Sequence, residues 1–341
     1  MDSVTQAALG AAVGGAVMGR HAGWRAFAAG AAVGTLPDLD SLVPFGGPVA
    51  DFVWHRGHTH ALFLQTLAAP LIAWPIQRLR RRHGDPPLRW LAAVWLILVT
   101  HALLDAATIY GTRLWLPFRE EAVGLGSIFI IDPLYTLPLL IGIVAAIAAA
   151  PARPRPAVAW NAAGLALSSA YLAWTVVAQQ LVEARAAAAL DDAGIRAERV
   201  LATPAPFNSV LWRIVAVGDG HHWEGFHTIG SGRPIGFRRY PDRRELLDGI
   251  GDTRPVQRLR DFTDGFFAVS ERDGAVVVTD LRMGQAGFYA FAFRVGVRRD
   301  GQTRATAVTR FEYPRPPLDV AVRELYACAA GRATQVIACR P

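Results

Sequence analysis

The chain contains no lysine, so all 35 of its basic side chains are arginine. With 28 acidic residues, these give a formal net charge of +7. Such a positive balance ordinarily suggests an acidic partner such as nucleic acid. Because arginine replaces lysine throughout, we attribute the excess to compositional bias and expect no nucleic-acid partner.

Cysteine is also scarce, with only Cys328 and Cys339 near the C-terminus. They would pair in an oxidising compartment, although chance placement explains them equally well. The chain lacks HisGluxxHis, GlyxSerxGly and P-loop motifs, so zincin, serine-hydrolase and NTPase functions have no support. It also shows no cleavable secretory signal, because Asp2 stands where a basic region is expected.

Acidic residues are rare in the first half of the chain, where residues 1–182 hold nine of the 28. Residues 183–341 hold the other 19 together with 23 arginines, which is ordinary for a soluble domain. The sequence therefore predicts a membrane half followed by a soluble half. Five of the nine acids lie in polar clusters of the apolar half, namely Asp2, Asp38, Asp40, Asp105 and Asp132.

Six apolar runs predict membrane helices, at residues 4–18, 24–36, 61–77, 90–110, 128–150 and 157–182. The last three reach the roughly 20 residues that span a bilayer, the third is marginal, and the first two are short. The first two carry glycines four apart, which let helices pack closely in lipid. We expect these two runs to form a tight hairpin that is short, tilted or re-entrant. The glycine pairs are Gly10 and Gly14, Gly15 and Gly19, and Gly30 and Gly34.

Arginine placement predicts the orientation, because cytoplasmic loops are enriched in arginine and lysine. The first, third and fifth connections hold Arg20, Arg25, Arg78, Arg80, Arg81, Arg82, Arg89, Arg153 and Arg155. Six alternating segments place these connections inside. The polar clusters and the C-terminal half then lie outside.

Beyond Glu183 the pattern changes to strands, predicted at residues 209–217, 223–229, 265–270, 275–281 and 287–297. Turn signals separate them at Gly218-Asp219-Gly220, Asp273-Gly274 and Asp300-Gly301, and a short helix is expected at 318–327. His221, His222 and His227 alternate with apolar residues, which favours strand positions over a metal site. The predicted fold is a multi-pass α-helical membrane domain (residues 1–182), a linker (183–206) and a small soluble β-rich (α+β) domain (207–341).

Carboxylates and imidazoles gather at the ends of the apolar runs, where ionised groups are costly and commonly functional. His101 and Asp105 are four residues apart, so they share one helix face. Aspartate and histidine without cysteine favour a hard or borderline divalent ion. We predict one metal constellation, holding one ion or two, with the ligands Asp38, Asp40, His55, His60, His101 and Asp105.

Simpler interpretations exist for parts of this set. His101 and Asp105 could share a structural hydrogen bond. Asp38 and Asp40 follow Pro37 and could form a turn with a helix cap. Thr59 could cap the third helix.

Several motifs occur together in one order along the chain. They are MetAspSerValThrGln at 1–6, GlyThrLeuProAspLeuAsp at 34–40, HisArgGlyHisThrHis at 55–60, HisAlaLeuLeuAsp at 101–105, IleAspProLeuTyrThrLeu at 131–137, ThrProAlaProPheAsn at 203–208 and ValThrAspLeuArgMetGly at 278–284. In these motifs the chain resembles the YdjM/YbcI-type family of inner-membrane proteins described as metal-dependent hydrolases. The order of aspartates and histidines also has a weaker likeness to zinc-dependent phospholipase C and P1-type nucleases.

The resemblance implies functional positions at Asp2, Thr5, Asp38, Asp40, His55, Arg56, Thr59, His60, His101, Asp105 and Asp132. His58 falls at a variable motif position, so we do not expect it to bind metal. Gln6 departs from the family, which often has histidine there. Either one ligand has been lost or that histidine is not essential.

Together these observations predict a hydrolase of the bacterial inner membrane. Zinc is the expected metal, and the expected substrate is a lipid-borne or envelope (phospho)ester at the outer face. We assign catalytic roles to Asp2, Arg56 and Asp132: Arg56 would clamp a phosphate or contact lipid headgroups, and Asp2 or Asp132 would serve as general base. The alternatives are a non-catalytic scaffold, for which one family branch has a LexA-binding role, and a metal transporter. A transporter would need ligands near the middle of the membrane.

Overall fold

A computed structural model describes residues 1–80, 83–150, 154–315, 317, 319–320, 323 and 327. The chain forms two compact units. The helical unit comprises Met1–Val43 and His55–Val176, and the β-rich unit comprises Pro44–Trp54 and Val177–Pro341. The short segment Pro44–Trp54 therefore interrupts the helical unit in sequence and belongs to the other unit.

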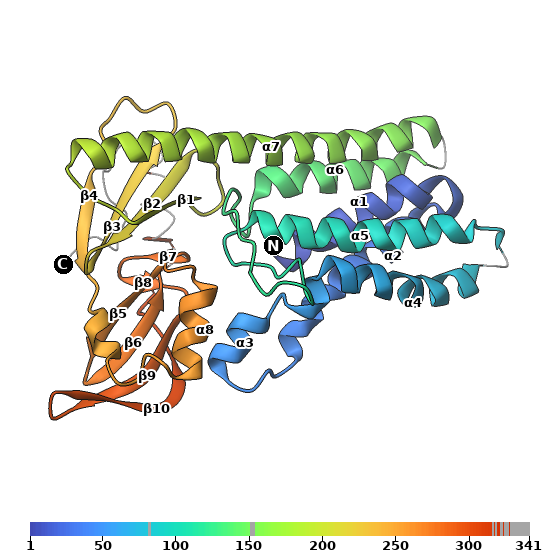
Figure 1. The fold of residues 1–341 in the computed structure, drawn as a ribbon. Helices are drawn as coiled ribbons and strands as arrows, with labels where there is room; N and C mark the ends of the chain where they lie inside the picture. The colour runs from blue at the N-terminus through green and yellow to red at the C-terminus, as the bar shows by residue number, and fades with distance from the viewer. Residues whose placement is uncertain are drawn as a thin grey trace. The chain divides into compact units, whose positions relative to one another are not determined.

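Each predicted apolar run forms a helix in the structure (Figure 1). The helices are α1 (Ser3–Ala22), α2 (Trp24–Thr35), α4 (Leu62–Arg80), α5 (Pro87–Ala107), α6 (Pro133–Ala149) and α7 (Pro154–Asp192). Two 3₁₀ turns, η1 (Pro37–Leu42) and η2 (His58–His60), precede and follow the segment Pro44–Trp54, which belongs to the β-rich unit. α7 begins in the helical unit and continues into the β-rich unit.

Fewer of these helices than the predicted six qualify as membrane spans. Among the described residues, α5 and the Ala157–Asp192 part of α7 are long and apolar enough to cross a bilayer. The bent pair Pro48–His60 and Leu62–Arg80 would make a third span if it acts as one. α2 has 12 residues and is about 18 Å long, which is short of the roughly 30 Å hydrocarbon core. The structure thus supports two to three candidate spans in a helical N-terminal region.

The glycines of α1 and α2 let the two backbones touch, as their spacing predicted. A Cβ atom on Gly14 would lie 2.6 Å from the Ala26 carbonyl oxygen, and one on Gly34 would lie 2.8 Å from the Gln6 oxygen. Gly10 and Gly30 face each other's backbone still more closely. Such contacts exclude any side chain and hold the hairpin together.

A second glycine contact joins α6 to α7, and no local sequence pattern predicts it. A Cβ atom on Gly142 would lie 2.9 Å from the Trp160 oxygen, and one on Gly164 would lie 2.5 Å from the Pro138 oxygen. Each helix contributes a single glycine here, so no small-xxx-small pair marks the position in either run.

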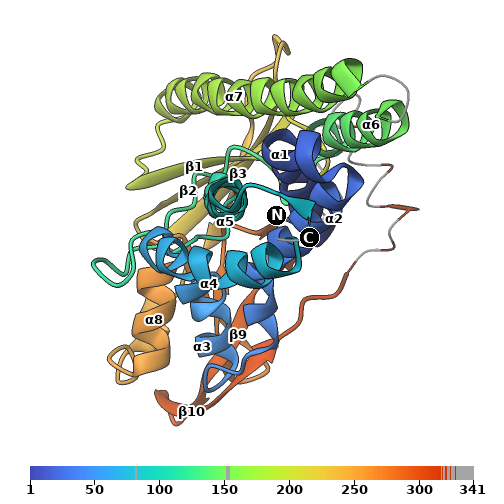
Figure 2. The ribbon, with the colours of Figure 1, turned by 90° about the vertical axis from the view of Figure 1, so that its right-hand side faces the viewer.

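α5 lies inside the helical unit and contacts α1, α2 and α4. Figure 2 shows α5 nearly end-on between α1 and α4. Its face toward the core includes Val94, Ile97, Leu98 and Leu104, all 2% exposed or less. Polar side chains at the C-terminal end of α5 are therefore held on a rigid, well-packed helix.

The β-rich unit has two four-stranded antiparallel sheets and a short hairpin. One sheet has the order β1 (Arg199–Pro204), β2 (Leu211–Gly218), β3 (His221–Thr228), β4 (Phe237–Pro241). The other has the order β10 (Gln302–Phe311), β9 (Ala292–Arg299), β6 (Ala275–Asp280), β5 (Phe267–Arg272). The hairpin pairs β7 (Gly284–Gln285) with β8 (Phe288–Tyr289), and the helical elements are η4 (Arg244–Leu247) and α8 (Arg254–Phe262).

The predicted β-rich character of this half is confirmed. Asp219, Asp273 and Asp300 adopt positive φ angles of 38°, 51° and 51° in the hairpin turns that their motifs predicted. β1, β4 and β10 were not predicted, because β4 and β10 are rich in arginine and exposed positions, and β1 lies within residues 183–206. Most of the helix predicted at 318–327 lies outside the described residues, as do Cys328 and Cys339.

The segment Pro44–Trp54 contains the helix α3 (Pro48–Trp54), which is part of the β-rich unit. The Phe52 ring contacts the rings of Phe262, Phe291 and Phe293, with centroid distances of 5.0, 4.5 and 5.4 Å. Aromatic burial of this kind anchors the loop at its middle.

A buried ionic network lies in the β-rich unit. The Glu224 carboxylate accepts hydrogen bonds from Arg213, from the Tyr289 hydroxyl at 2.5 Å and from the Ala286 backbone at 3.0 Å. His222 stacks on Tyr240 with centroids 5.2 Å apart, and its Nε2 lies 3.2 Å from the Tyr289 hydroxyl oxygen. His221, His222 and His227 all lie on β3, as the strand interpretation required.

We predict that His222 makes the β-rich unit less stable in acid. Burial lowers the pKa of His222 to about 4, against about 6.5 in an unfolded chain. Between pH 6.5 and 4 the unfolded state binds more protons than the folded state. The free energy of unfolding therefore decreases as the pH falls through that range, by about 3 kcal/mol in total. Thermal unfolding of the full chain at stepped pH measures this loss. His222→Phe keeps the ring stack and should flatten the profile, and an unchanged profile would contradict the assignment.

Candidate metal centre

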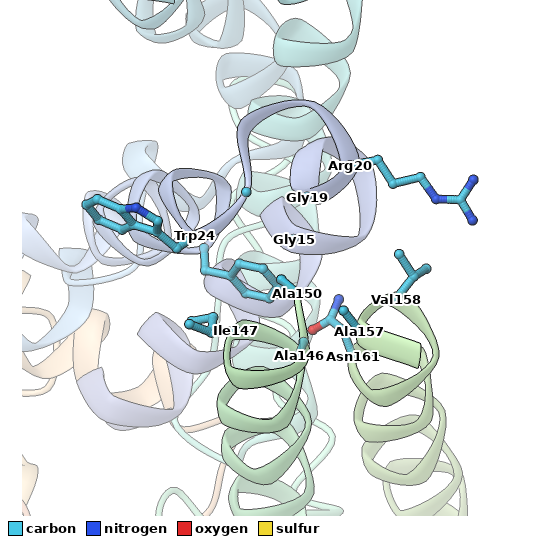
Figure 3. Close-up of a pocket in the computed structure, with 12 residues that line it drawn as sticks. Gly15, Gly19, Arg20, Trp24, Ala146, Ile147, Ala150, Ala157, Val158 and Asn161 are labelled. Atoms are coloured by element: carbon cyan, nitrogen blue, oxygen red, sulfur yellow. The ribbon is translucent and has the colours of Figure 1, made fainter. Parts of the chain in front are cut away.

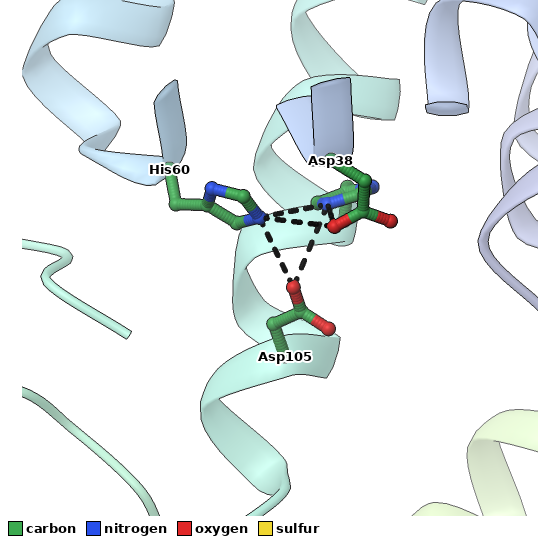
Figure 4. Close-up of side chains that lie close together, drawn as sticks. Asp38, His60 and Asp105 are labelled. Atoms are coloured by element: carbon green, nitrogen blue, oxygen red, sulfur yellow. Dashed lines mark hydrogen bonds and ion pairs between the residues drawn. The ribbon is translucent and has the colours of Figure 1, made fainter. Parts of the chain in front are cut away.

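Four acidic and imidazole side chains converge in the helical unit from three elements. Asp38 comes from η1, His60 from η2, and His101 and Asp105 from α5 (Figure 4). One ligand atom from each lies within 4.8 Å of the others. His60, His101 and Asp105 have side chains at most 1% exposed, whereas that of Asp38 is 17% exposed.

The distances between these ligand atoms suit a small cation with tetrahedral coordination. Asp38 Oδ1 lies 3.6 Å from Nε2 of His60 and 3.6 Å from Nε2 of His101. Asp105 Oδ2 lies 3.1 Å and 3.6 Å from the same two nitrogens. Ligand atoms at zinc bonding distance in a tetrahedron stand about 3.3 Å apart. The described chain therefore contains a group of residues that could bind a metal ion.

The hydrogen bonds of the two histidines determine which ring nitrogens are free. Nδ1 of His101 donates to the Gly34 carbonyl oxygen at 2.7 Å. The Thr59 hydroxyl donates to Asp40 Oδ2 at 2.7 Å, so it accepts from Nδ1 of His60 at 2.9 Å. Both Nε2 atoms then lack hydrogen in the neutral rings, and they face each other at 3.0 Å. Opposed lone pairs at this distance repel unless a cation lies between them.

Local sequence explains how these side chains reach one point. Pro37 follows the end of α2 and starts the 3₁₀ turn that carries Asp38. Arg56 at φ 63° reverses the chain between α3 and η2, which delivers His60. The spacing of His101 and Asp105 places both on one face of α5, as predicted.

Asp105 is surrounded by positive and donor groups. Its Oδ1 accepts from the Met1 amine and from the Gln6 side-chain nitrogen at 2.9 Å. Its Oδ2 lies 3.2 Å from Arg56 Nε but has no hydrogen-bond partner in the described structure. An orphaned carboxylate oxygen that lies within 3.6 Å of two imidazole Nε2 atoms fits a metal ligand. Gln6 thus holds Asp105 in place, and its amide nitrogen also donates to the His101 carbonyl oxygen at 3.2 Å.

Asp40 and His55, the other two predicted ligands, form a pair beside the four-residue group. Asp40 Oδ1 lies 2.7 Å from His55 Nδ1, and its Oδ2 accepts from the backbone of Arg56 at 2.9 Å. Burial by itself raises the pKa of Asp40, but hydrogen bonds with His55 and Thr59 outweigh it and hold that pKa below its usual value. Asp40 thus positions both His55 and Thr59, and through Thr59 it orients His60.

The three residues predicted to be catalytic occupy different places. The Arg56 guanidinium is buried, donates to Thr108 Oγ1 at 3.1 Å and lies 5.0 Å over the Tyr110 ring. Asp2 caps α1 through the Val4 and Thr5 amides. Asp132 caps α6 and accepts from the Tyr171 hydroxyl at 2.8 Å. Arg56 therefore contacts the ligand group directly, whereas Asp2 and Asp132 act as helix caps in this structure.

A second polar network links the two caps. Asp2 Oδ2 accepts from the Thr5 hydroxyl at 2.5 Å, and Thr5 Oγ1 lies 2.7 Å from Thr136 Oγ1 at the start of α6. The exposed His58 is not among the four residues that could hold a metal ion. Sequence reasoning missed the contributions of Gly34 and Thr108. Gly34 acts through its backbone oxygen, for which residue type gives no signal.

The sequence model of the YdjM inner membrane protein family matches residues 1–182. The chain belongs to this family. The match covers the entire helical unit and confirms the resemblance found in the motifs. No curated protein and no solved structure gives a significant match. The family description and the apolar helices together indicate a protein of the inner membrane.

Proposed function

We propose that this YdjM-family protein is a metal-dependent hydrolase whose ion is held by Asp38, His60, His101 and Asp105. The observation that carries the proposal is that the Nε2 atoms of His60 and His101 face each other at 3.0 Å beside an orphaned Asp105 oxygen. Two imidazoles and two carboxylates suit zinc, and the two negative charges balance a divalent cation. A bound zinc ion acts as a Lewis acid and lowers the pKa of a coordinated water.

Exposure indicates the side from which a substrate enters. Asp38 is the most exposed ligand at 17%, and the neighbouring His55 side chain is 23% exposed. Catalytic zinc sites keep one coordination position open, whereas structural sites are closed by protein ligands. We infer that a fifth coordination position, open to water and substrate, lies on the Asp38 side of the four protein ligands.

The chain's own residues supply the remaining functions. The Asp40 carboxylate holds His55 Nδ1 at 2.7 Å, which orients the ring to accept a proton at Nε2. The His55 and His60 ring centroids are 6.5 Å apart, so His55 lies next to the ligand group. Arg56 pairs with Asp105 and places positive charge beside the ligands, which favours an anionic substrate such as a phosphoester.

If all six apolar helices alternate across the bilayer, including those shorter than a full span, the arginine-rich connections support an orientation in which the metal centre and the β-rich unit face outward. A lipid-borne or envelope phosphoester at the outer face of the inner membrane is then the proposed substrate class. Alkaline phosphatase fused after Leu190 should be active in this orientation. An inactive fusion, with an active cytoplasmic reporter at the same position, would reverse it.

Hydrolysis is tested with zinc-loaded full-length protein in detergent, using bis(p-nitrophenyl) phosphate and p-nitrophenyl acetate as probes. We expect turnover of the phosphodiester, lowered about 10²- to 10⁴-fold in kcat by His55→Gln with bound zinc unchanged. His58→Gln, a matched exposed histidine, should leave both unchanged. If zinc-loaded protein turns over neither probe, the hydrolase proposal fails.

One observation favours a second function. All four candidate ligands come from the protein and three are at most 1% exposed, as in a closed structural zinc site. A structural ion would make this protein a non-catalytic membrane scaffold or binding protein. Zinc binding without turnover of either probe is the result that selects this alternative.

A further inference from the structure

The helical unit has a cavity at the end opposite the metal centre, lined by α1, α2, α6 and α7 (Figure 3). Its volume is about 470 Å³, which is within the usual range for ligand sites. Gln6 at the metal centre and Arg20 at the cavity are fourteen residues apart on α1, or about 21 Å along the helix. The cavity is therefore separate from the centre described above.

Its walls are apolar and its rim is basic. Phe27, Ile147 and Val158 line it together with small residues of α1 and α6. Arg20 extends from the end of α1 at the rim, with Trp24 on the opposite side. Arg20 is exposed and has no acidic partner among the described residues, and Arg25 lies 5.3 Å over the Trp24 ring. Tryptophan and arginine together are typical of the headgroup level of a membrane.

One polar group interrupts the apolar wall. Asn161 is 3% exposed and donates its side-chain nitrogen to the Ala12 carbonyl oxygen at 2.9 Å. That bond orients the amide, and the Asn161 Oδ1 atom is left buried without a hydrogen-bond partner. An unsatisfied acceptor of this kind shows that the described residues do not satisfy every polar group of this wall.

We propose that this cavity binds an anionic glycerophospholipid such as phosphatidylglycerol. Its acyl chain fits the apolar walls, and its phosphate fits Arg20, which has no acidic partner among the described residues. Basic pockets between membrane helices recognise anionic headgroups in this way. Phosphatidylcholine carries no net negative charge, so it should be excluded.

The test is native mass spectrometry of the full chain exchanged into an equimolar mixture of phosphatidylglycerol and phosphatidylcholine with identical acyl chains. We expect retained phosphatidylglycerol, and Arg20→Gln should reduce its retention about tenfold or more. Arg78→Gln removes another exposed arginine of the helical unit and should have no effect. Equal retention of the two lipids by the unmodified protein would overturn the proposal.

A second variant is designed to fill the cavity. Gly19 lines the cavity, and a Cβ atom there would lie 3.8 Å from Phe27 Cε2, so we expect the Gly19→Leu side chain to extend into the cavity. This variant should lose phosphatidylglycerol while keeping its thermal stability and its bound zinc. Retention of the lipid at the unmodified level would contradict the proposal. Because zinc content is measured separately, failure of the lipid site and failure of the metal centre are distinguishable.

Discussion

His101→Ala protein should purify with less than a tenth of the zinc bound by the unmodified chain. His101 supplies one of the two facing Nε2 atoms, and its ring is held by the Gly34 oxygen at 2.7 Å, so no other side chain can take its place. Removing one of four ligands leaves two carboxylates and one imidazole, which bind zinc far more weakly. The measurement is metal content by mass spectrometry after equilibration with limiting zinc.

The matched control is His58→Ala, which removes an exposed histidine two residues from His60. It should leave zinc content unchanged. Asp105→Asn provides a second test, because it removes the negative charge while keeping the shape of the side chain and an oxygen that can accept from Gln6. Full zinc stoichiometry in both His101→Ala and Asp105→Asn would show that these residues do not hold the ion.

Gly30→Leu should destabilise the helical unit by about 3 kcal/mol or more and should also weaken zinc binding. A side chain at Gly30 meets the backbone of Gly10 directly, so α1 and α2 must separate. The same hairpin delivers two supports of the metal centre: Gln6 on α1 holds Asp105, and Gly34 on α2 holds His101. Separation of α1 from α2 therefore displaces Gln6 and Gly34, and with them the ligands Asp105 and His101.

Thermal unfolding and zinc content of the purified protein measure the two effects of Gly30→Leu. Gly19→Leu is the matched control, since it adds the same side chain to the hairpin where a Cβ atom has ordinary contacts. The control should unfold at the unmodified temperature. Equal stability of the two variants would show that the glycine contact does not hold the hairpin closed.

Much of the local structure was predictable, because local signals determine it. Apolar runs produced the helices, and the Asp-Gly turns produced the hairpins of the β-rich unit. Glycines four apart predicted the α1–α2 contact, because small residues on one helix face permit backbone approach. The contact of Gly142 with Gly164 had no such local pattern, since it forms from one residue on each helix.

Membrane spanning was less predictable than helix formation. α2 is apolar but short, and α6 has only 17 residues, so apolarity did not imply sufficient length. α3 was also missed, because it packs through Phe52 against residues more than 200 positions later in the chain. Contacts at such separation leave no periodic pattern in either segment.

By itself, the sequence determined the family, the helical and β-rich halves and the residue types available for a metal centre. Those properties depend on composition, periodicity and short motifs, which are local. Tertiary structure decided the roles within the site. It brought Asp38, His60, His101 and Asp105 together, set Asp40 beside His55, and made Asp2 and Asp132 helix caps. These roles depend on distances between separate elements, and residue type alone cannot distinguish a carboxylate that faces an imidazole from one that caps a helix.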